Sequence, residues 1–598
     1  MSDYPSKSFI EHSRFKRRGE LLRIAKERHV NLGLVVGLSW RANGHQTHVD
    51  YVGGLDTGKL QAKLAGLAGW GTKSDGLEPP AEKEEHLPSL RDALIDAAPL
   101  DLRLETAAER KRRSKGKHRD FAGILAQIDT DAIASFALDI LQARYRLAPE
   151  RGPPPLQLPR TYGPLYGSAH VFYTLDFREG TKWIVKIPTN GTPDTWDKMC
   201  AETLRTEALV LYMLRTETSI PVPEIIDADS SPHNEIHVPY LIMECIEGRT
   251  LDRVWFGEDG SGEDGNEGKL REKRMRILQN LAAAMLQLGK YEFERGGAPV
   301  FDGGGALVGV GPLRELDVQT MVWRWFRDED CDKEPVYVDV GPFADTREMY
   351  TALLDMYPED GEANAGVDKL LRLLINIIRE PSALDPAAEG GKGKGKVKRG
   401  FVLTHPGLNM RDIIVSKDGD IKGILGWDGV RIAPRSLGNE AFPTWLVRDF
   451  NPFLWRWQPA PELWRLKDND IGRPEGNRFE DAPWVLRELR DRYVKIIQEL
   501  NKEAGGYAGA YEDADVYITK QSLLALSLDM AVRDPRCRAA ILRRILEKCS
   551  SRFEVFDFDQ VVEALGNNGH MDGYKLKCLE RSFKELINRG YVRGAVVW

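Results

Sequence analysis

A lysine in an apolar strand and a glutamate on the next helix are the residues of this sequence best suited to chemistry. Lys186 lies in the run Trp-Ile-Val-Lys-Ile over 183–187. A lysine in such a strand can reach the α- and β-phosphates of ATP. Glu207 lies on the following predicted helix and could hold this lysine in an ion pair. Glu202 is an alternative partner, and plain surface charge is the competing interpretation for both residues.

Glycines and a strand end flank this pair in the sequence. Gly163, Gly167 and Ser168 are expected between the first two strands, where a glycine turn can fold backbone amides over phosphates. Glycine-rich hairpins are common, so this turn alone is weakly specific. Met243 and Glu244 end a later strand. If that strand leads into a hinge between two lobes, their backbone groups would meet an adenine ring.

Hydrophobic patterning predicts the elements that would position these residues. The runs 171–177 and 182–187 indicate two strands joined by a hairpin turn. Helical periodicity covers 200–216 and 269–294, with a strand near 238–244 between them. This is the layout of a kinase. The predicted fold class is therefore α+β, a bilobal protein-kinase-like fold with a small antiparallel-sheet N-lobe and a mostly helical C-lobe. An N-terminal extension and a helical C-terminal region complete it.

The most specific segment runs from Phe401 to Val430 and reads FVLTHPGLNMRDIIVSKDGDIKGILGWDGV. It resembles the catalytic and metal-binding loops of the aminoglycoside phosphotransferase and choline kinase superfamily, and is most similar to the fungal branch. That family reads roughly His-x-Asp-x-x-x-x-Asn, then an apolar strand, a turn and Ile-Asp-Trp-Asp/Glu. The stretches at 433–440 and 443–452 also resemble the fungal branch. The resemblance leaves residues 1–150 outside it.

This chain departs from the family pattern at the acids that the resemblance assigns to catalysis. The catalytic aspartate, which orients or deprotonates the acceptor hydroxyl, falls on Gly407. The aspartate that bridges magnesium to the phosphates falls on Gly426, and the metal-binding asparagine falls on Asp412. His405 is retained, and its family role is to brace the loop. General-base help is worth roughly 10²–10⁴-fold, so the resemblance implies little turnover.

Two carboxylates remain in this segment that could hold a metal ion. Asp412 and Asp428 could together bind one Mg²⁺, displaced from the family's position, because magnesium is usually held by one or two carboxylates plus phosphates and waters. The competing interpretation is that both are surface acids of a decayed site. Asn409 is a weaker candidate for contacting substrate or backbone. ATP and Mg²⁺ are the cofactors that such a site would use.

Three functions fit these residues. The joint loss at Gly407 and Gly426 favours a pseudokinase that binds nucleotide with little or no catalysis. The retained Lys186 leaves open an active ATP-dependent small-molecule hydroxyl kinase with Asp412 and Asp428 as displaced metal ligands. A non-catalytic scaffold is the third hypothesis. The expected partners are a nucleotide and an unknown small molecule or protein, and the sequence does not fix an acceptor.

Composition bounds the class of protein and its expected location. A net charge of −7 over 598 residues gives no global case for nucleic-acid or membrane binding. Apolar runs stay below the roughly 18 residues of a membrane span, and the first residues lack the apolar core of a secretory signal. Six well-separated cysteines argue against zinc and disulfides. These features predict a cytoplasmic protein, while the basic run 110–119 leaves the nucleus open.

The predicted domain limits follow from shifts in composition. Residues 1–150 form an N-terminal extension that is mixed and partly helical, and the kinase-like N-lobe covers 151–248. The C-lobe covers 249–455, with flexible insertions near 257–268 and 385–399 that carry too few apolar residues to offset ordering entropy. The helical C-terminal region covers 456–598.

Overall fold

The computed structural model describes a two-lobed chain. The residues described are 121–147, 157–257, 267–317, 320, 337–357, 362–378, 400–458, 479–503, 517–566 and 571–592, apart from Ser168 and Glu179. The basic run 110–119, the turn residue Ser168 and most of the two predicted insertions lie outside this set. Within the described residues, no helix combines the length and apolar character needed to cross a membrane.

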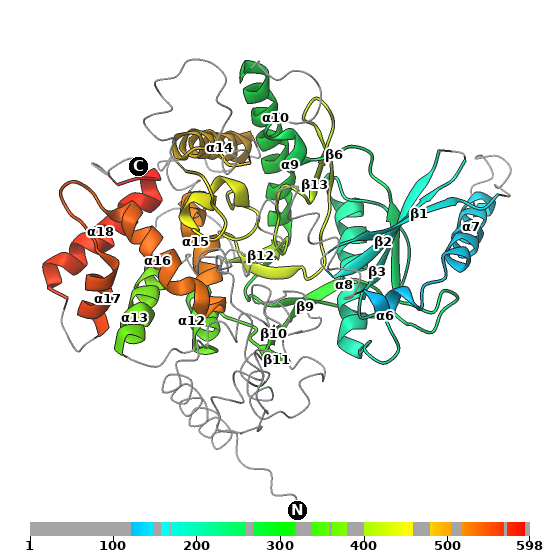
Figure 1. Cartoon of the computed structure of the whole chain (residues 1–598), viewed down its shortest axis with the longest axis horizontal. Helices are drawn as coiled ribbons and strands as arrows, with labels where there is room; N and C mark the ends of the chain where they lie inside the picture. The colour runs from blue at the N-terminus through cyan, green and yellow to red at the C-terminus, as the bar shows by residue number, and fades with distance from the viewer. Residues whose placement is uncertain are drawn as a thin grey trace, which may run out of the picture.

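The smaller lobe is a five-stranded antiparallel sheet in the order β1-β2-β3-β5-β4 (Figure 1). Its strands are β1 Arg160–Tyr166, β2 His170–Asp176, β3 Lys182–Pro188, β4 Ile225–Asp229 and β5 Tyr240–Glu244. Because side chains alternate along a strand, Val171, Val185 and Ile242 all point to one face. Helices α6 (Ala122–Leu125) and α7 (Thr130–Leu147) cover that face and share its core.

Helix α8 (Lys198–Glu217) packs on the opposite face of this sheet, between the two lobes (Figure 1). The Asp197 carboxylate caps its first turn by accepting from the Cys200 amide at 2.7 Å. Leu204 and Leu211 bury the inner side of the helix in a core that also contains Leu241 of β5. The helix therefore links the small lobe to the large one.

The larger lobe is mostly helical. Its helices are α9 Leu251–Val254, α10 Glu267–Leu286, α12 Thr346–Asp355, α13 Glu362–Ile377, α14 Pro483–Glu503, α15 Tyr517–Arg533, α16 Pro535–Cys549, α17 Phe558–Gly566 and α18 Gly573–Arg589. Short 3₁₀ helices are η4 Gln287–Lys290, η5 Thr444–Leu446 and η6 Arg448–Phe450. One core runs from α8 to α18, so α14–α18 pack as part of this lobe.

Short strands of the large lobe carry the loops of interest. β12 (Phe401–Thr404) lies between β15 (Arg431–Pro434) and β7 (Glu292–Phe293), while β13 (Ile413–Val415) lies between β14 (Ile421–Ile424) and β6 (Arg249–Thr250). Two hairpins are formed by β8 (Ala298–Phe301) with β9 (Leu307–Gly311) and by β10 (Leu313–Leu316) with β11 (Tyr337–Val340).

The predicted bilobal α+β fold is confirmed: a small antiparallel sheet lobe adjoins a mostly helical lobe. The packing divides the described residues into two cores. Helix α7, which precedes the predicted domain limit at residue 150, shares the core of the small lobe. Helices α14–α18, which follow the predicted limit at residue 456, share the core of the large lobe.

Candidate functional site

Lys186 and Glu207 meet in the buried space between β3 and α8. Alternation along β3 sends Val185 to the core beneath α7 and Lys186 to the opposite face, where α8 packs. The Lys186 Nζ donates to both Glu207 carboxylate oxygens at 2.8 Å, and each residue is 3% exposed. Glu202 instead lies 4.0 Å from Arg205 on the exposed side of the helix. The structure thus pairs Lys186 with Glu207.

A second acid reaches the same lysine from the large lobe. The Asp428 Oδ1 lies 3.4 Å from the Lys186 Nζ. Burial alone would lower the pKa of Lys186, but the charges of Asp428 and Glu207 raise it above its ordinary value. Burial would raise the pKa of Asp428, and Lys186 with His170 holds it below its ordinary value. Lys186 and Asp428 are therefore both charged at neutral pH.

At Glu207, the third member of this cluster, burial outweighs the neighbouring charge in setting the direction of the pKa shift. It raises the pKa of Glu207 above its ordinary value despite the opposing charge of Lys186. Two carboxylates therefore share one ammonium at the junction of the lobes. Taking these groups out of water is costly, and perturbed ionisable groups of this kind concentrate at functional sites.

His405 ties together the two loops that the resemblance singles out. It follows β12, and its Nε2 lies 2.7 Å from the Leu425 carbonyl oxygen. Its ring packs edge-on against Trp427, with centroids 4.8 Å apart. Burial lowers the pKa of His405 to about 4, so the ring is neutral at pH 7. In the neutral tautomer with Nε2–H, Nδ1 accepts from the Gly407 amide at 3.3 Å.

The two glycines at the family's acid positions have different surroundings. A Cβ built on Gly407 would meet nothing within 4 Å, so a side chain fits there. Gly426 has φ +79, and its Cβ would lie 3.0 Å from the Asp412 Oδ1. The other oxygen of Asp412 accepts from the Asn409 amide at 3.0 Å and from its Nδ2 at 2.7 Å. The Asp412 carboxylate is therefore fixed against the position that lacks an acid.

The glycine turn differs from the prediction in one respect. Gly167 closes the β1–β2 turn, donating to the His170 carbonyl oxygen at 2.8 Å. The structure places Gly163 inside β1, however, and not in the turn. The β1–β2 register shifts between Tyr162 and Leu165, and a Cβ on Gly163 would come within 2.9 Å of the Phe172 carbonyl oxygen. Gly163 thus accommodates an irregularity of the strand at a close backbone approach.

An apolar surface beside Lys186 was missed by the sequence reasoning. Leu165 pairs with Phe172, which in turn pairs with Lys186, so these three side chains share one face of the sheet. Leu165 is 59% exposed, and Ile184 lies on the same face two residues from Lys186. Apolar side chains beside a few polar groups are typical of the lining of a ligand site. Side chains two residues apart along a strand share a face, so the residues two positions from Lys186 could have indicated this surface.

The predicted hinge residues Met243 and Glu244 lie at the end of β5. The side chain of Met243 is nearly buried beside Ile184, its partner in the sheet. The Glu244 amide donates to the Glu224 carbonyl oxygen at 2.9 Å, and the next amide, Cys245, donates to the Lys182 carbonyl oxygen at 3.0 Å. A base meeting this strand end would therefore have to use carbonyl groups or later amides. The hinge role stays a prediction.

The structure thus brings most of the predicted site residues to the junction of the lobes. Lys186, Glu207 and Asp428 form one cluster, and the loop contacts of His405 and Asp412 adjoin the segment that leads to Asp428. In the part of the chain that the structure describes, no three His, Cys, Asp or Glu side chains form a ready metal cage. A magnesium ion held by Asp412 and Asp428 would need phosphate oxygens and waters as further ligands.

Comparison with models of known protein families finds no match. The chain is similar to "Altered inheritance of mitochondria protein 9, mitochondrial" of Eremothecium gossypii, with 19% identity over 373 residues that cover 56% of this chain and 57% of that protein. For the protein of the same name from Kluyveromyces lactis, identity is 19% over 362 residues, or 55% of each chain. The chain therefore spans little more than half the length of these curated relatives.

Solved structures with a similar arrangement come from the superfamily that segment 401–430 resembles. A putative aminoglycoside phosphotransferase from Ralstonia eutropha is 12% identical, with a TM-score of 0.33, covering 77% of this chain and 99% of that one. Plasmodium vivax ethanolamine kinase is 10% identical, with a TM-score of 0.30, covering 72% and 84%. At these identities the likeness concerns the fold alone.

The names of the relatives overturn one prediction. They are designated mitochondrial, so the predicted cytoplasmic location, with the nucleus as its variant, is wrong. The cytoplasmic prediction depended on the lack of the apolar core of a secretory signal. Mitochondrial targeting segments are instead amphipathic, Arg-rich and poor in acids. The lack of a secretory signal could therefore not separate mitochondria from the cytoplasm.

Proposed function

We propose that this chain, which has the kinase-like fold of the aminoglycoside phosphotransferase and choline kinase superfamily, binds a nucleoside triphosphate and transfers its phosphoryl group slowly or not at all. The observation that carries this proposal is the buried cluster in which Lys186 contacts Glu207 at 2.8 Å and Asp428 at 3.4 Å. The lysine offers phosphates a charged donor, and the apolar face around Leu165 offers a base a surface. Gly407 and Gly426 offer no carboxylate for catalysis.

The residues described supply two carboxylates for a magnesium ion but no complete set of ligands. Asp412 and Asp428 are the acids that would hold the ion, and its charge would offset that of the phosphates. Asp428 also contacts Lys186, so the metal ion that this acid would hold and the Lys186 ammonium would act on neighbouring phosphates from the two lobes. With Gly at position 407, no side chain there accepts a proton from a hydroxyl. These features support nucleotide binding over turnover.

A second candidate is an active ATP-dependent kinase acting on the hydroxyl of a small molecule. One observation favours it: the Asp412 Oδ1 lies 3.0 Å from where a Cβ of Gly426 would be. A carboxylate from position 412, where the family has asparagine, therefore lies beside the position that lacks an acid. The names of the curated relatives support a mitochondrial setting for either function.

The substitution Lys186→Met tests the proposal. We expect ATP affinity to fall by roughly 10- to 100-fold, since a hydrogen bond to a charged group contributes about 1.5–3 kcal/mol and the substitution removes the ammonium that would contact the phosphates. Isothermal titration calorimetry with ATP measures the change. Lys182→Met is the matched control, because Lys182 lies on the same strand but is exposed and pairs with Glu247 at 3.0 Å. Equal affinities for the Lys186→Met and unmodified chains would reject the proposal.

A further inference from the structure

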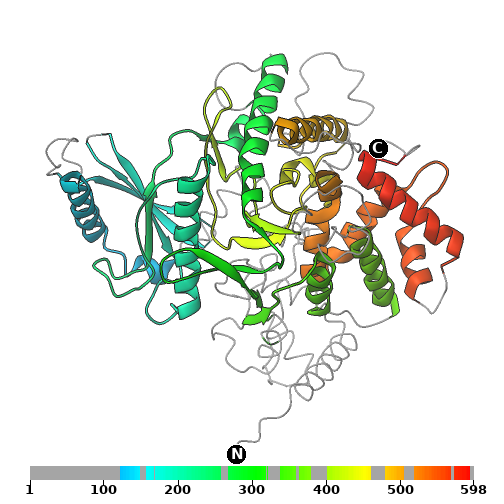
Figure 2. The same ribbon diagram turned by 180° about the vertical axis from the view of Figure 1, so that it is seen from behind.

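Helix α8 carries Glu207, so the position of this helix decides whether Lys186 keeps its partner. A single segment of the large lobe, residues 287–316, runs beside α8 and is called the brace below. It comprises η4, β7, the β8–β9 hairpin and β10. Figure 2 shows the hairpin in green, reaching from the large lobe to the side of α8.

The brace contacts both ends of α8. At the start of the helix, the Arg314 Nη2 lies 3.4 Å from the Oδ2 of Asp197, the residue that caps the helix. At the last turn, the Glu217 Oε2 lies 2.6 Å from the Lys290 Nζ and accepts from the Tyr291 hydroxyl at 3.2 Å. Both contacts oppose movement of the helix along its axis.

The brace also contacts the middle of α8, close to Glu207. The Arg205 Nη2 donates to the Asp302 carbonyl oxygen at 2.8 Å. A Cβ on Gly305, in the same hairpin turn, would lie 3.0 Å from the Leu209 side chain. The turn is itself held by the Asp302 Oδ1, which accepts from the amides of Gly304 and Ala306 at 2.9 Å each. This hydrogen-bonded turn therefore lies against α8 at Arg205 and Leu209, the residues two positions before and after Glu207.

The brace is hydrogen-bonded to the sheet that contains β12, the strand before His405. β7 pairs with β12, which ends one residue before His405. Gly297 exchanges two backbone hydrogen bonds with Ile432 of β15, at 2.9 and 2.7 Å. The brace thus connects α8 of the small lobe to β12 and β15, the strands on either side of the loops that contain His405, Asp412 and Asp428.

We propose that Arg205, Lys290 and Arg314 are positioning residues that, through the brace, fix α8 so that Glu207 stays on Lys186 without a bound ligand. In protein kinases the lysine–glutamate pair must be in place for function, and movement of the helix controls it. Here a pre-formed pair would spare a nucleotide the cost of ordering the site. Only this consequence for affinity rests on the proposed function.

The reactivity of Lys186 tests the positioning without any nucleotide. Acetylation by acetic anhydride, followed by peptide mass spectrometry, gives the rate at Lys186 relative to exposed Lys182 on the same strand. In the variant Arg205→Ala/Lys290→Ala/Arg314→Ala, we expect this ratio to rise roughly 5- to 20-fold, since each exposed polar contact contributes a modest share. If this variant does not fold, Arg205→Ala alone should give a smaller rise in the same direction.

Two controls separate positioning from general destabilisation. The charge-conserving variant Arg205→Lys/Lys290→Arg/Arg314→Lys should keep the ratio near that of the unmodified chain. Arg543→Ala removes an exposed ion pair with Asp559, at 3.2 Å on α16 and α17, and should also leave the ratio unchanged. An unchanged ratio in the alanine variant, or an equal rise in either control, would overturn the inference.

Calorimetry with ATP on the same variants then connects the brace to binding. We expect affinity to fall in the alanine variant and to hold in the charge-conserving one. A rise in Lys186 reactivity with no ATP binding by any of the chains would uphold the positioning role and reject the proposed function. The two failures are thereby distinguishable.

Discussion

The triple variant Gly407→Asp/Asp412→Asn/Gly426→Asp will show ATP hydrolysis roughly 10²–10⁴-fold faster than the unmodified chain, because it regains a general base and a primary metal ligand. A Cβ at Gly407 meets nothing within 4 Å, so an aspartate fits there. At position 426 the φ of +79 strains most side chains, but aspartate tolerates this region better than most. Water serves as acceptor, so the assay needs no identified substrate.

The change at Asp412 is required by the geometry. In Gly407→Asp/Gly426→Asp with Asp412 kept, the new Cβ would lie 3.0 Å from the Asp412 Oδ1, and two carboxylates would face each other. We expect this double variant to be less stable and to recover much less activity than the triple variant. Asparagine at 412 relieves the repulsion and returns the residue that the family has there.

Gly429→Asp is the control for the added acid. Gly429 has φ +74 and nothing within 4 Å of its Cβ, so the substitution adds the same charge in a similar backbone conformation. It should leave hydrolysis at the level of the unmodified chain. If the triple variant hydrolyses ATP no faster than Gly429→Asp, the assignment of positions 407 and 426 is wrong.

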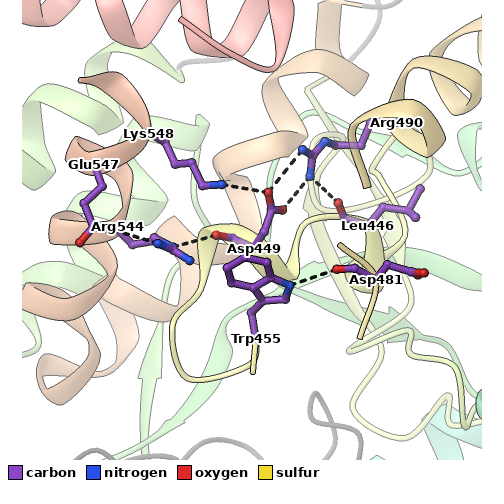
Figure 3. Close-up of polar contacts among 8 residues, drawn as sticks. All are labelled: Leu446, Asp449, Trp455, Asp481, Arg490, Arg544, Glu547 and Lys548. Atoms are coloured by element: carbon purple, nitrogen blue, oxygen red, sulfur yellow. Dashed lines mark hydrogen bonds and ion pairs between the residues drawn. The ribbon is translucent and has the colours of Figure 1, made fainter. Parts of the chain in front are cut away.

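Asp449→Ala will lower the free energy of unfolding by about 3–5 kcal/mol, the cost of removing one partner of a buried ion pair. Figure 3 shows Asp449 between α14 and α16. Its Oδ1 lies 2.7 Å from the Arg490 Nη1, and its Oδ2 lies 3.3 Å from the Lys548 Nζ. The residue is 1% exposed, so its loss leaves two cations without their shared counter-charge.

The backbone and the surroundings of Asp449 add to this expectation. Its carbonyl oxygen accepts from the Arg544 Nε at 3.1 Å, and Arg544 also lies over the Trp455 ring at 4.9 Å (Figure 3). Burial would raise the pKa of Asp449, but Arg490 and Lys548 hold it below its ordinary value. The carboxylate is therefore ionised at neutral pH, and it ties the C-terminal helices to the rest of the lobe.

Urea unfolding followed by circular dichroism measures this loss. Asp559→Ala is the matched control, because Asp559 is exposed and pairs with Arg543 at 3.2 Å. Exposed pairs of this kind contribute about 0–1 kcal/mol. Asp449→Asn keeps the shape and removes the charge, and should fall between the two. A similar stability for Asp449→Ala and Asp559→Ala would contradict the role assigned to this carboxylate.

Local patterns in the sequence predicted the two lobes and the elements that carry Lys186 and Glu207. The apolar run 183–187 predicted the strand that carries Lys186, and helical periodicity over 200–216 predicted the helix that carries Glu207. The choice between Glu202 and Glu207 depended on the rotation of the helix against the sheet. Tertiary packing sets that rotation, so the sequence left both open.

Contacts between distant residues could not be predicted in this way. Arg205 and Asp302 are 97 residues apart in the chain, and no periodicity relates them. The approach of Asp412 to Gly426 depends on how two loops fold against each other. Gly163 was expected in a turn because glycine is common there, whereas an irregularity inside β1 is what uses it. Each of these features follows from packing across the chain.

Calorimetric titration of the unmodified chain with ATP, in magnesium and again in EDTA, with ADP measured in parallel, tests the central claim most directly. A nucleotide-binding protein with an impaired site should give saturable binding that persists in EDTA, held by Lys186, and little ADP above the level of the Lys186→Met variant. No binding under either condition would contradict the claim and favour a scaffold. Magnesium-dependent binding with turnover equal to that of the triple variant would also contradict it and favour an active kinase.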